Sequence, residues 1–110
     1  MQINSPFGNR ESLLNLCKTH NVKRMYAFGS AVTNKFNPEK SDIDLIVEID
    51  ENDPIEKGEK LISLWDKLEA LFKRRVDLLT DQPIKNPYLK SAIDRTKILI
   101  YDRGGEKILI

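Results

Sequence analysis

Hydrophobic and polar residues alternate most regularly over residues 42–49, whose sequence is DIDLIVEI. On a strand, Ile43, Leu45, Val47 and Ile49 would point to one side, and the residues between them to the other. This alternation is typical of a strand that buries one face. The same stretch begins with two carboxylates, which is unusual at the mouth of an apolar run.

Other stretches show short strand-like apolar runs or apolar residues at helical spacing. The longest helical pattern, over 55–72, consists of Leu61, Leu64, Trp65, Leu68, Leu71 and Phe72. Asn86 followed by Pro87 is typical of a helix start, with an N-cap and a proline at the first position. The predicted order is helix, strand, strand, helix, strand, helix, strand. This order predicts a small α/β (α+β) fold, a short mixed β-sheet with helices packed on it. The predicted helices cover 10–21, 55–72 and 88–95, and the predicted strands cover 22–28, 42–49, 74–80 and 97–101.

The chain has 110 residues, which we interpret as a single domain, 1–110, with a tail from about residue 102 that is flexible or interfacial. Its 18 basic and 17 acidic residues leave a net charge of +1, so direct nucleic-acid binding is not expected. The chain has one cysteine and one histidine. A single cysteine cannot form an intrachain disulfide, and a zinc site or a histidine-based catalytic triad would lack its other residues. No secretory or membrane-spanning pattern is present, so we expect a cytoplasmic protein.

The carboxylates Asp42 and Asp44 are the first candidates for chemistry. Two residues apart on a strand, their side chains leave the same face. Asp77 lies in a similar setting, between Val76 and Leu78 in another apolar strand. If the two strands pair in register, three carboxylates converge. The alternatives are a solvated turn for the first two, and a surface ion pair with a neighbouring arginine for Asp77.

Converging carboxylates raise one another's pKa values unless cations neutralise them. Magnesium prefers oxygen ligands and suits a site that also holds phosphates. Two ions about 3.5–4 Å apart would support in-line phosphoryl or nucleotidyl transfer. Gly29 and Ser30 follow a predicted strand, where glycine permits close backbone approach and a hydroxyl holds phosphate oxygens. Such a pair alone is usually only a turn.

Together these residues resemble a known family. FGS at 28–30, SDIDLIV at 41–47 and VDLL at 76–79 are similar to the nucleotidyltransferase superfamily that includes DNA polymerase beta. The chain has the size of the minimal stand-alone members, the MNT proteins. The resemblance runs from about Val22 to Tyr101 and implies the nucleotidyltransferase fold.

The resemblance also implies roles for individual residues. Gly29 and Ser30 would bind the triphosphate of ATP. Asp42 and Asp44 would ligate two Mg²⁺ ions, and Asp77 would ligate the catalytic ion and help to activate the acceptor hydroxyl. Ser41 is grouped with the nucleotide site, where it caps or orients the start of its strand.

The sequence departs from the family in the loop after Ser30. Many minimal members carry arginine directly after the GS pair and glycine three residues later, whereas this chain has Ala31 and Asn34. This difference bears on nucleotide affinity and on the choice of nucleotide, and leaves the three carboxylates untouched.

Members of this size are similar to antitoxins paired with a HEPN-domain ribonuclease toxin. The implied reaction is transfer of AMP from ATP to a tyrosine hydroxyl of the toxin. Two alternatives stay open: an antitoxin that acts by contact alone, and a transferase that modifies a small molecule such as a drug. A homodimer or a toxin partner would cover apolar residues near the C-terminus, unless these complete the domain's own core. They are Ile98, Leu99, Ile100, Ile108, Leu109 and Ile110.

Overall fold

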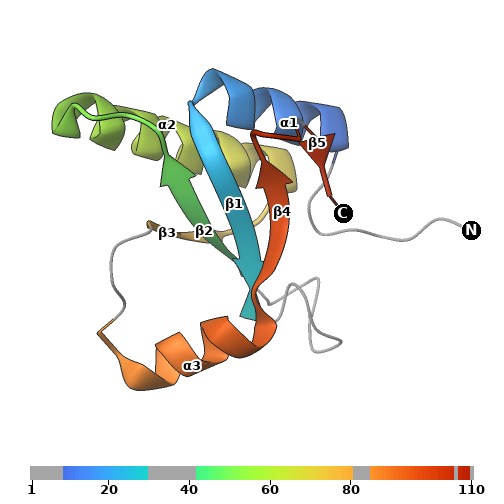
Figure 1. Ribbon diagram of the computed structural model, residues 1–110. Coiled ribbons are helices and arrows are strands. Elements are labelled where there is room, and N and C mark those ends of the chain that lie inside the picture. Colours follow the sequence, from blue (N-terminus) through green and yellow to red (C-terminus); the bar gives the residue numbers. More distant parts are fainter. Residues whose placement is uncertain (1–8, 30–41, 81–84, 106, 110) are drawn as a thin grey trace, which may run out of the picture.

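The computed structural model arranges the chain as a sheet with helices packed on it (Figure 1). It describes residues 9–29, 42–80, 85–105 and 107–109. The helices are α1 (Arg10–Thr19), α2 (Pro54–Phe72) and α3 (Pro87–Thr96). The strands are β1 (Val22–Phe28), β2 (Ile43–Ile49), β3 (Val76–Thr80), β4 (Ile98–Asp102) and β5 (Lys107–Ile108). The predicted order of elements and the mixed sheet are confirmed, and the tail adds β5.

The strand order β3-β2-β1-β4-β5 brings three strand ends together. β2 pairs with β3 in parallel, and the other neighbours are antiparallel. Phe28, at the end of β1, pairs with Asp44 near the start of β2, and Asp44 pairs with Asp77 near the start of β3. The carboxyl end of β1 therefore lies beside the amino ends of β2 and β3.

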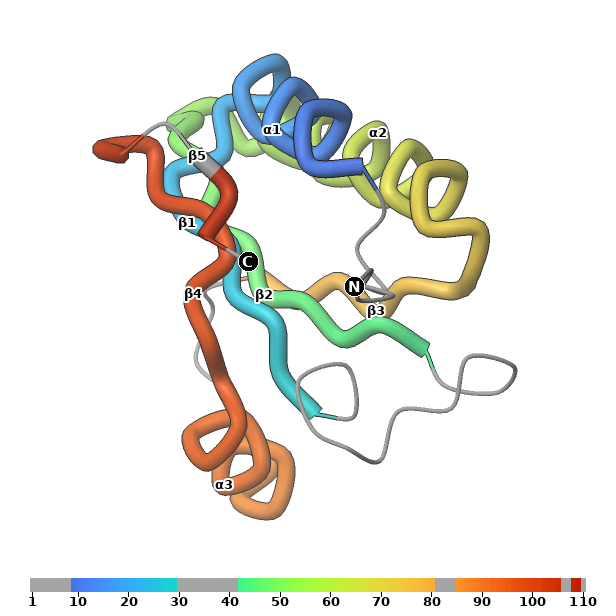
Figure 2. The backbone as a smooth tube through the Cα atoms, turned by 90° about the vertical axis from the view of Figure 1, so that its right-hand side faces the viewer, coloured from blue at the N-terminus to red at the C-terminus, as the bar shows by residue number. Residues whose placement is uncertain are grey.

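Helices α1 and α2 lie side by side on one face of the sheet, whereas α3 lies at the far end of the molecule (Figure 2). The alternation of β2 explains this layering, because its apolar residues are buried and the residues between them are only half-buried. The buried side chains of β2 belong to the same hydrophobic cluster as residues of both covering helices. These are Ile43, Leu45, Val47 and Ile49 of β2, Leu13 and Cys17 of α1, and Leu64 and Leu68 of α2.

Side-chain caps fix where the helices begin. Asp53 accepts a hydrogen bond from the Ile55 amide at 2.9 Å, and Pro54 occupies the first turn of α2. Asn86 accepts one from the Tyr88 amide at 2.9 Å, which confirms the predicted cap of α3. An N-cap of this kind satisfies amide groups that have no partner within the helix.

The apolar residues of the C-terminal stretch are divided between core and surface. Ile100 and Tyr101 of β4 are buried in the core. Ile98 and Leu109 remain 41% and 46% exposed. The described part of this stretch thus contributes to the domain's own core and also leaves apolar surface. Within the described residues, no helix is both long enough and apolar enough to cross a membrane.

Candidate active site

Asp44 and Asp77 meet at the adjacent ends of β2 and β3. Their residues are direct partners in the parallel register, and the two side chains share a hydrogen bond. The sequence placed these residues on similar strands, and the structure brings them together on one face.

The pKa of Asp44 is raised to about 6 from an ordinary value of 3.8. Desolvation by burial is the largest cause, followed by the charge of Asp77, the hydrogen bond with Asp77 and the charge of Asp42. All four influences raise the pKa, so none of them comes from a neighbouring cation. The site therefore concentrates negative charge.

Gly29 closes the site on the side of β1. Its backbone has a φ of +69°, in the left-handed region, and an added Cβ would lie 2.7 Å from Oδ2 of Asp44. Glycine is needed here for both reasons: the conformation disfavours other residues, and the carboxylate occupies the space of a side chain. The glycine that follows the strand in the sequence FGS is therefore explained by its close packing against Asp44.

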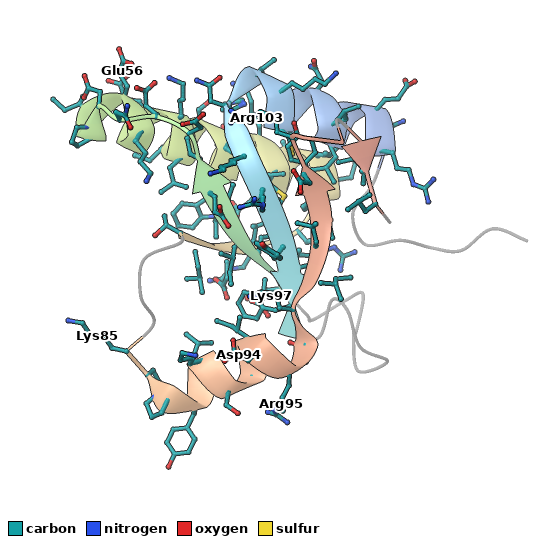
Figure 3. All side chains as sticks on the ribbon, viewed as in Figure 1. Glu56, Lys85, Asp94, Arg95, Lys97 and Arg103 are labelled. Atoms are coloured by element: carbon teal, nitrogen blue, oxygen red, sulfur yellow. The ribbon has the colours of Figure 1, made fainter. Side chains whose placement is uncertain are left out.

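Helix α3 holds Gly29 in place. The Gly29 amide donates a hydrogen bond to Oγ1 of Thr96 at 2.8 Å, and that hydroxyl donates to the Ala92 carbonyl at 2.7 Å. The next residue, Lys97, lies where α3 joins β4 (Figure 3). Its Nζ is 5.0 Å from the centre of the Tyr26 ring, within the range of a cation–π contact. Sequence reasoning missed Thr96, which carries no motif.

Helix α2 holds the start of β3. β3 is an edge strand, and the Ile43 amide bonds to the Arg75 carbonyl at 3.0 Å, so the backbone groups of Val76 point away from β2. Two side chains of α2 satisfy them. Nε1 of Trp65 donates to the Val76 carbonyl at 2.7 Å, and Oε2 of Glu69 accepts from the Val76 amide at 2.9 Å. Asp77 follows Val76 directly and is positioned by this clamp.

A pocket of about 370 Å³ adjoins the two carboxylates. Its wall is mostly apolar, with Asp44 and Asp77 as the charged members. The helical spacing of Trp65 predicted a residue of the apolar helix face, but the structure leaves this side chain 44% exposed at the pocket. The lining residues are Phe28, Asp44, Trp65, Asp77, Leu78, Leu79 and Leu89.

Asp42 lies just before β2 and acts on Asp44 through its charge. In the part of the chain that the structure describes, no group of three or more His, Cys, Asp or Glu side chains is arranged to hold a metal ion. The chemistry of the close pair nevertheless fits a hard divalent cation, since it offers carboxylate oxygens and the charges acting on Asp44 come from other carboxylates. Ser30, Ser41, Ala31 and Asn34 lie outside the described residues.

Comparison with known proteins identifies the family. Residues 10–100 match the nucleotidyltransferase domain family, which is most of the chain. A protein of Methanocaldococcus jannaschii, named "putative protein adenylyltransferase", is 38% identical over 81 residues, covering 74% of this chain and 79% of the relative. The chain therefore belongs to the nucleotidyltransferase domain family and is a nucleotidyltransferase.

Solved structures show the same fold. One described as a "putative minimal nucleotidyltransferase" has a TM-score of 0.61 and 31% identity, and the match covers 81% of this chain and 86% of that one. A complex from Shewanella oneidensis contains a tri-AMPylated HEPN toxin and an MNT antitoxin. The matched chain has a TM-score of 0.55 and 18% identity, with 87% of this chain and 71% of that one covered.

Proposed function

We propose that the protein transfers AMP from ATP to a tyrosine hydroxyl of a HEPN-domain ribonuclease toxin and thereby acts as its antitoxin. The observation that carries the proposal is the Asp44–Asp77 pair, held beside Gly29 at the ends of three adjacent strands. Membership of the nucleotidyltransferase family supports the reaction class. The name of the archaeal relative and the AMPylated toxin of the Shewanella complex support a protein acceptor.

In the proposed reaction, the phenolic oxygen attacks the α-phosphorus of ATP. A bond forms between that oxygen and phosphorus, the bond from the α-phosphorus to the oxygen bridging to the β-phosphate breaks, and pyrophosphate leaves. The phenolic proton passes to the carboxylate of Asp77. Gly29 and Ser30 hold the triphosphate, and Ser41 orients the strand that carries Asp42 and Asp44.

Asp42, Asp44 and Asp77 would hold Mg²⁺. When bound, the ion supplies positive charge that neutralises the carboxylates and the triphosphate. The raised pKa of Asp44, about 6, supports this assignment, because burial and the charges of Asp77 and Asp42 all disfavour its ionised form, which a cation would stabilise. Without a cation, the same charge would repel ATP.

The test is mass spectrometry of the HEPN partner after incubation with ATP and Mg²⁺. We expect AMP adducts on tyrosine with the wild-type protein and none with Asp42→Ala or Asp77→Ala. Both variants should still fold and bind the partner, because neither Asp77 nor Asp42 is a buried residue of the core. Asp66→Ala is the control, since Asp66 is an exposed carboxylate on α2 that does not line the pocket. A partner that is silenced by the wild-type protein without a change in mass would show instead that the protein acts by contact.

A further inference from the structure

We propose that the pocket beside Asp77 is the acceptor site, that it takes a phenol ring, and that Trp65 is the residue that selects this ring. The inference rests on the proposed function and names the part of the protein that recognises the acceptor. Three features of the described residues carry it: the position of the pocket, its chemistry and the way in which Trp65 is held.

The position of the pocket follows from the order of strands. Gly29, Asp44 and Asp77 lie on three adjacent strands, β1, β2 and β3, with Asp44 in the middle. Gly29 itself does not line the pocket, but its neighbour Phe28 at the end of β1 does, together with Asp44 of β2 and the β3 residues Asp77, Leu78 and Leu79. The pocket therefore adjoins both carboxylates at the strand ends, next to the glycine proposed to hold the triphosphate. An acceptor hydroxyl in the pocket would lie beside Asp77, the carboxylate proposed to take its proton.

The chemistry of the pocket suits a phenol. Five of the seven lining residues are apolar, and the other two are the carboxylates. A tyrosine side chain has an apolar ring and a single hydroxyl at its tip, so the ring would contact the leucines and the indole while the hydroxyl reaches Asp77. A serine or threonine hydroxyl would leave most of this apolar wall in contact with water. The volume of about 370 Å³ leaves ample room for one such ring.

Trp65 forms a fixed aromatic wall. Its neighbours on α2, Leu64 and Leu68, are buried in the core, whereas the indole is 44% exposed. An exposed side chain is usually free to move, but the bond from its Nε1 to the Val76 carbonyl holds this one at 2.7 Å. Because Asp77 is the next residue, a single clamp sets the spacing between the aromatic wall and the carboxylate. A ring stacked on Trp65 would then meet Asp77 without any rearrangement.

A binding experiment can use the protein's own reporter, because Trp65 is the only tryptophan in the chain. The probe is N-acetyl-L-tyrosinamide, added to the wild-type protein with Mg²⁺ and a non-hydrolysable ATP analogue. We expect a saturable change in tryptophan emission, a weaker one with the phenylalanine amide, and none with the serine amide. A change caused by the ATP analogue but not by the tyrosine amide would mean that the pocket holds the nucleobase, and the inference would be wrong.

Steady-state kinetics with the HEPN partner test the same inference. We expect Trp65→Ala to raise the KM for the protein acceptor about tenfold while the KM for ATP stays within about twofold. Trp65→Phe keeps an aromatic face but loses the bond to the Val76 carbonyl, so it should recover only part of the loss. Ile62→Ala is the matched control, since Ile62 is 67% exposed on the same helix and does not line the pocket. Circular dichroism checks that each variant is folded.

The two proposals fail in different ways. If the wild-type protein transfers no AMP to the partner, the proposed function is wrong. If it does transfer AMP, and Trp65→Ala has the acceptor KM of the wild type, only the acceptor site is wrong. An increase in the KM for ATP with an unchanged acceptor KM would also overturn it.

Discussion

Gly29 illustrates how much one residue constrains the candidate site. We expect Gly29→Ala to lower the free energy of unfolding by about 1–2 kcal/mol, the usual cost of a left-handed conformation with a Cβ, and the contact with Asp44 would add to it. The new methyl group would also displace the carboxylate, because it would lie only 2.7 Å from Oδ2. Urea unfolding measures the loss. Gly58→Ala is a control of opposite sign: it lies within α2, where an added Cβ meets nothing within 4 Å, so we expect a gain of about 0.5–1 kcal/mol.

Asp44 gives a prediction on pH. Its pKa is about 6 in the folded protein and 3.8 ordinarily, so the folded state binds the proton more tightly. The free energy of unfolding contributed by this group is therefore greatest below the ordinary pKa and falls as the pH rises towards 6. We expect Asp44→Asn, measured with a chelator present, to be more stable than the wild type at pH 7.5 and to lose this advantage by pH 4.

Thermal unfolding at a series of pH values tests this prediction. Asp66→Asn serves as the control, because this exposed carboxylate of α2 has no part in the pair. A stability advantage of Asp44→Asn that is the same at pH 4 and pH 7.5 would contradict the prediction. It would mean that the side chain acts through packing and not through its charge.

Among the elements, the short edge strand β3 depends most on support from a helix. Glu69 accepts a hydrogen bond from the Val76 amide, and Trp65 donates to the Val76 carbonyl. We expect Glu69→Ala to lower the free energy of unfolding by about 1–2 kcal/mol, because it removes a charged acceptor from a partly buried amide. In this variant, hydrogen exchange of the Val76 amide should accelerate more than exchange of the amides at the centre of β2.

Glu69→Gln and Glu59→Ala are the comparisons for this variant. Glutamine keeps a side-chain oxygen and should retain most of the protection of Val76. Glu59 is exposed on the same helix, so its removal should leave the amide unchanged. Equal exchange of the Val76 amide in the wild type and in Glu69→Ala would show that the bond to Glu69 does not protect this amide.

The elements that sequence could predict are those with a local signal. The alternation of β2 predicted both its buried and its half-buried face, and Asn86 with Pro87 predicted the start of α3. The sequence could not show that Asp44 pairs with Asp77, because it does not specify the register of two parallel strands. That register depends on how α2, which connects β2 to β3, packs on the sheet. The exposure of Trp65 could not be predicted either. Helical spacing identifies an apolar face, and whether one residue of that face covers the core or lines a pocket depends on β3.

At the level of the whole molecule, the site and the core form one cooperative unit. Ile43, Leu45 and Val76 belong to the hydrophobic cluster formed by the described residues, and they alternate along β2 and β3 with the two aspartates of the site. A ligand that binds across the ends of β1, β2 and β3 should therefore stabilise the complete fold and not a local segment. The stability of the protein then reports directly on occupancy of the site.

We expect ATP together with Mg²⁺ to raise the melting temperature of the wild-type protein, and ATP with a chelator to leave it nearly unchanged. Saturation to about 100 times the Kd adds about 2.7 kcal/mol to the free energy of unfolding, which corresponds to about 10 °C for a domain of this size. The requirement for the cation follows from the carboxylates, which repel the triphosphate until their charge is neutralised. Asp77→Asn should reduce the shift, whereas Asp66→Asn should keep it. A rise of equal size with and without Mg²⁺ would show that ATP binds elsewhere, away from Asp44 and Asp77.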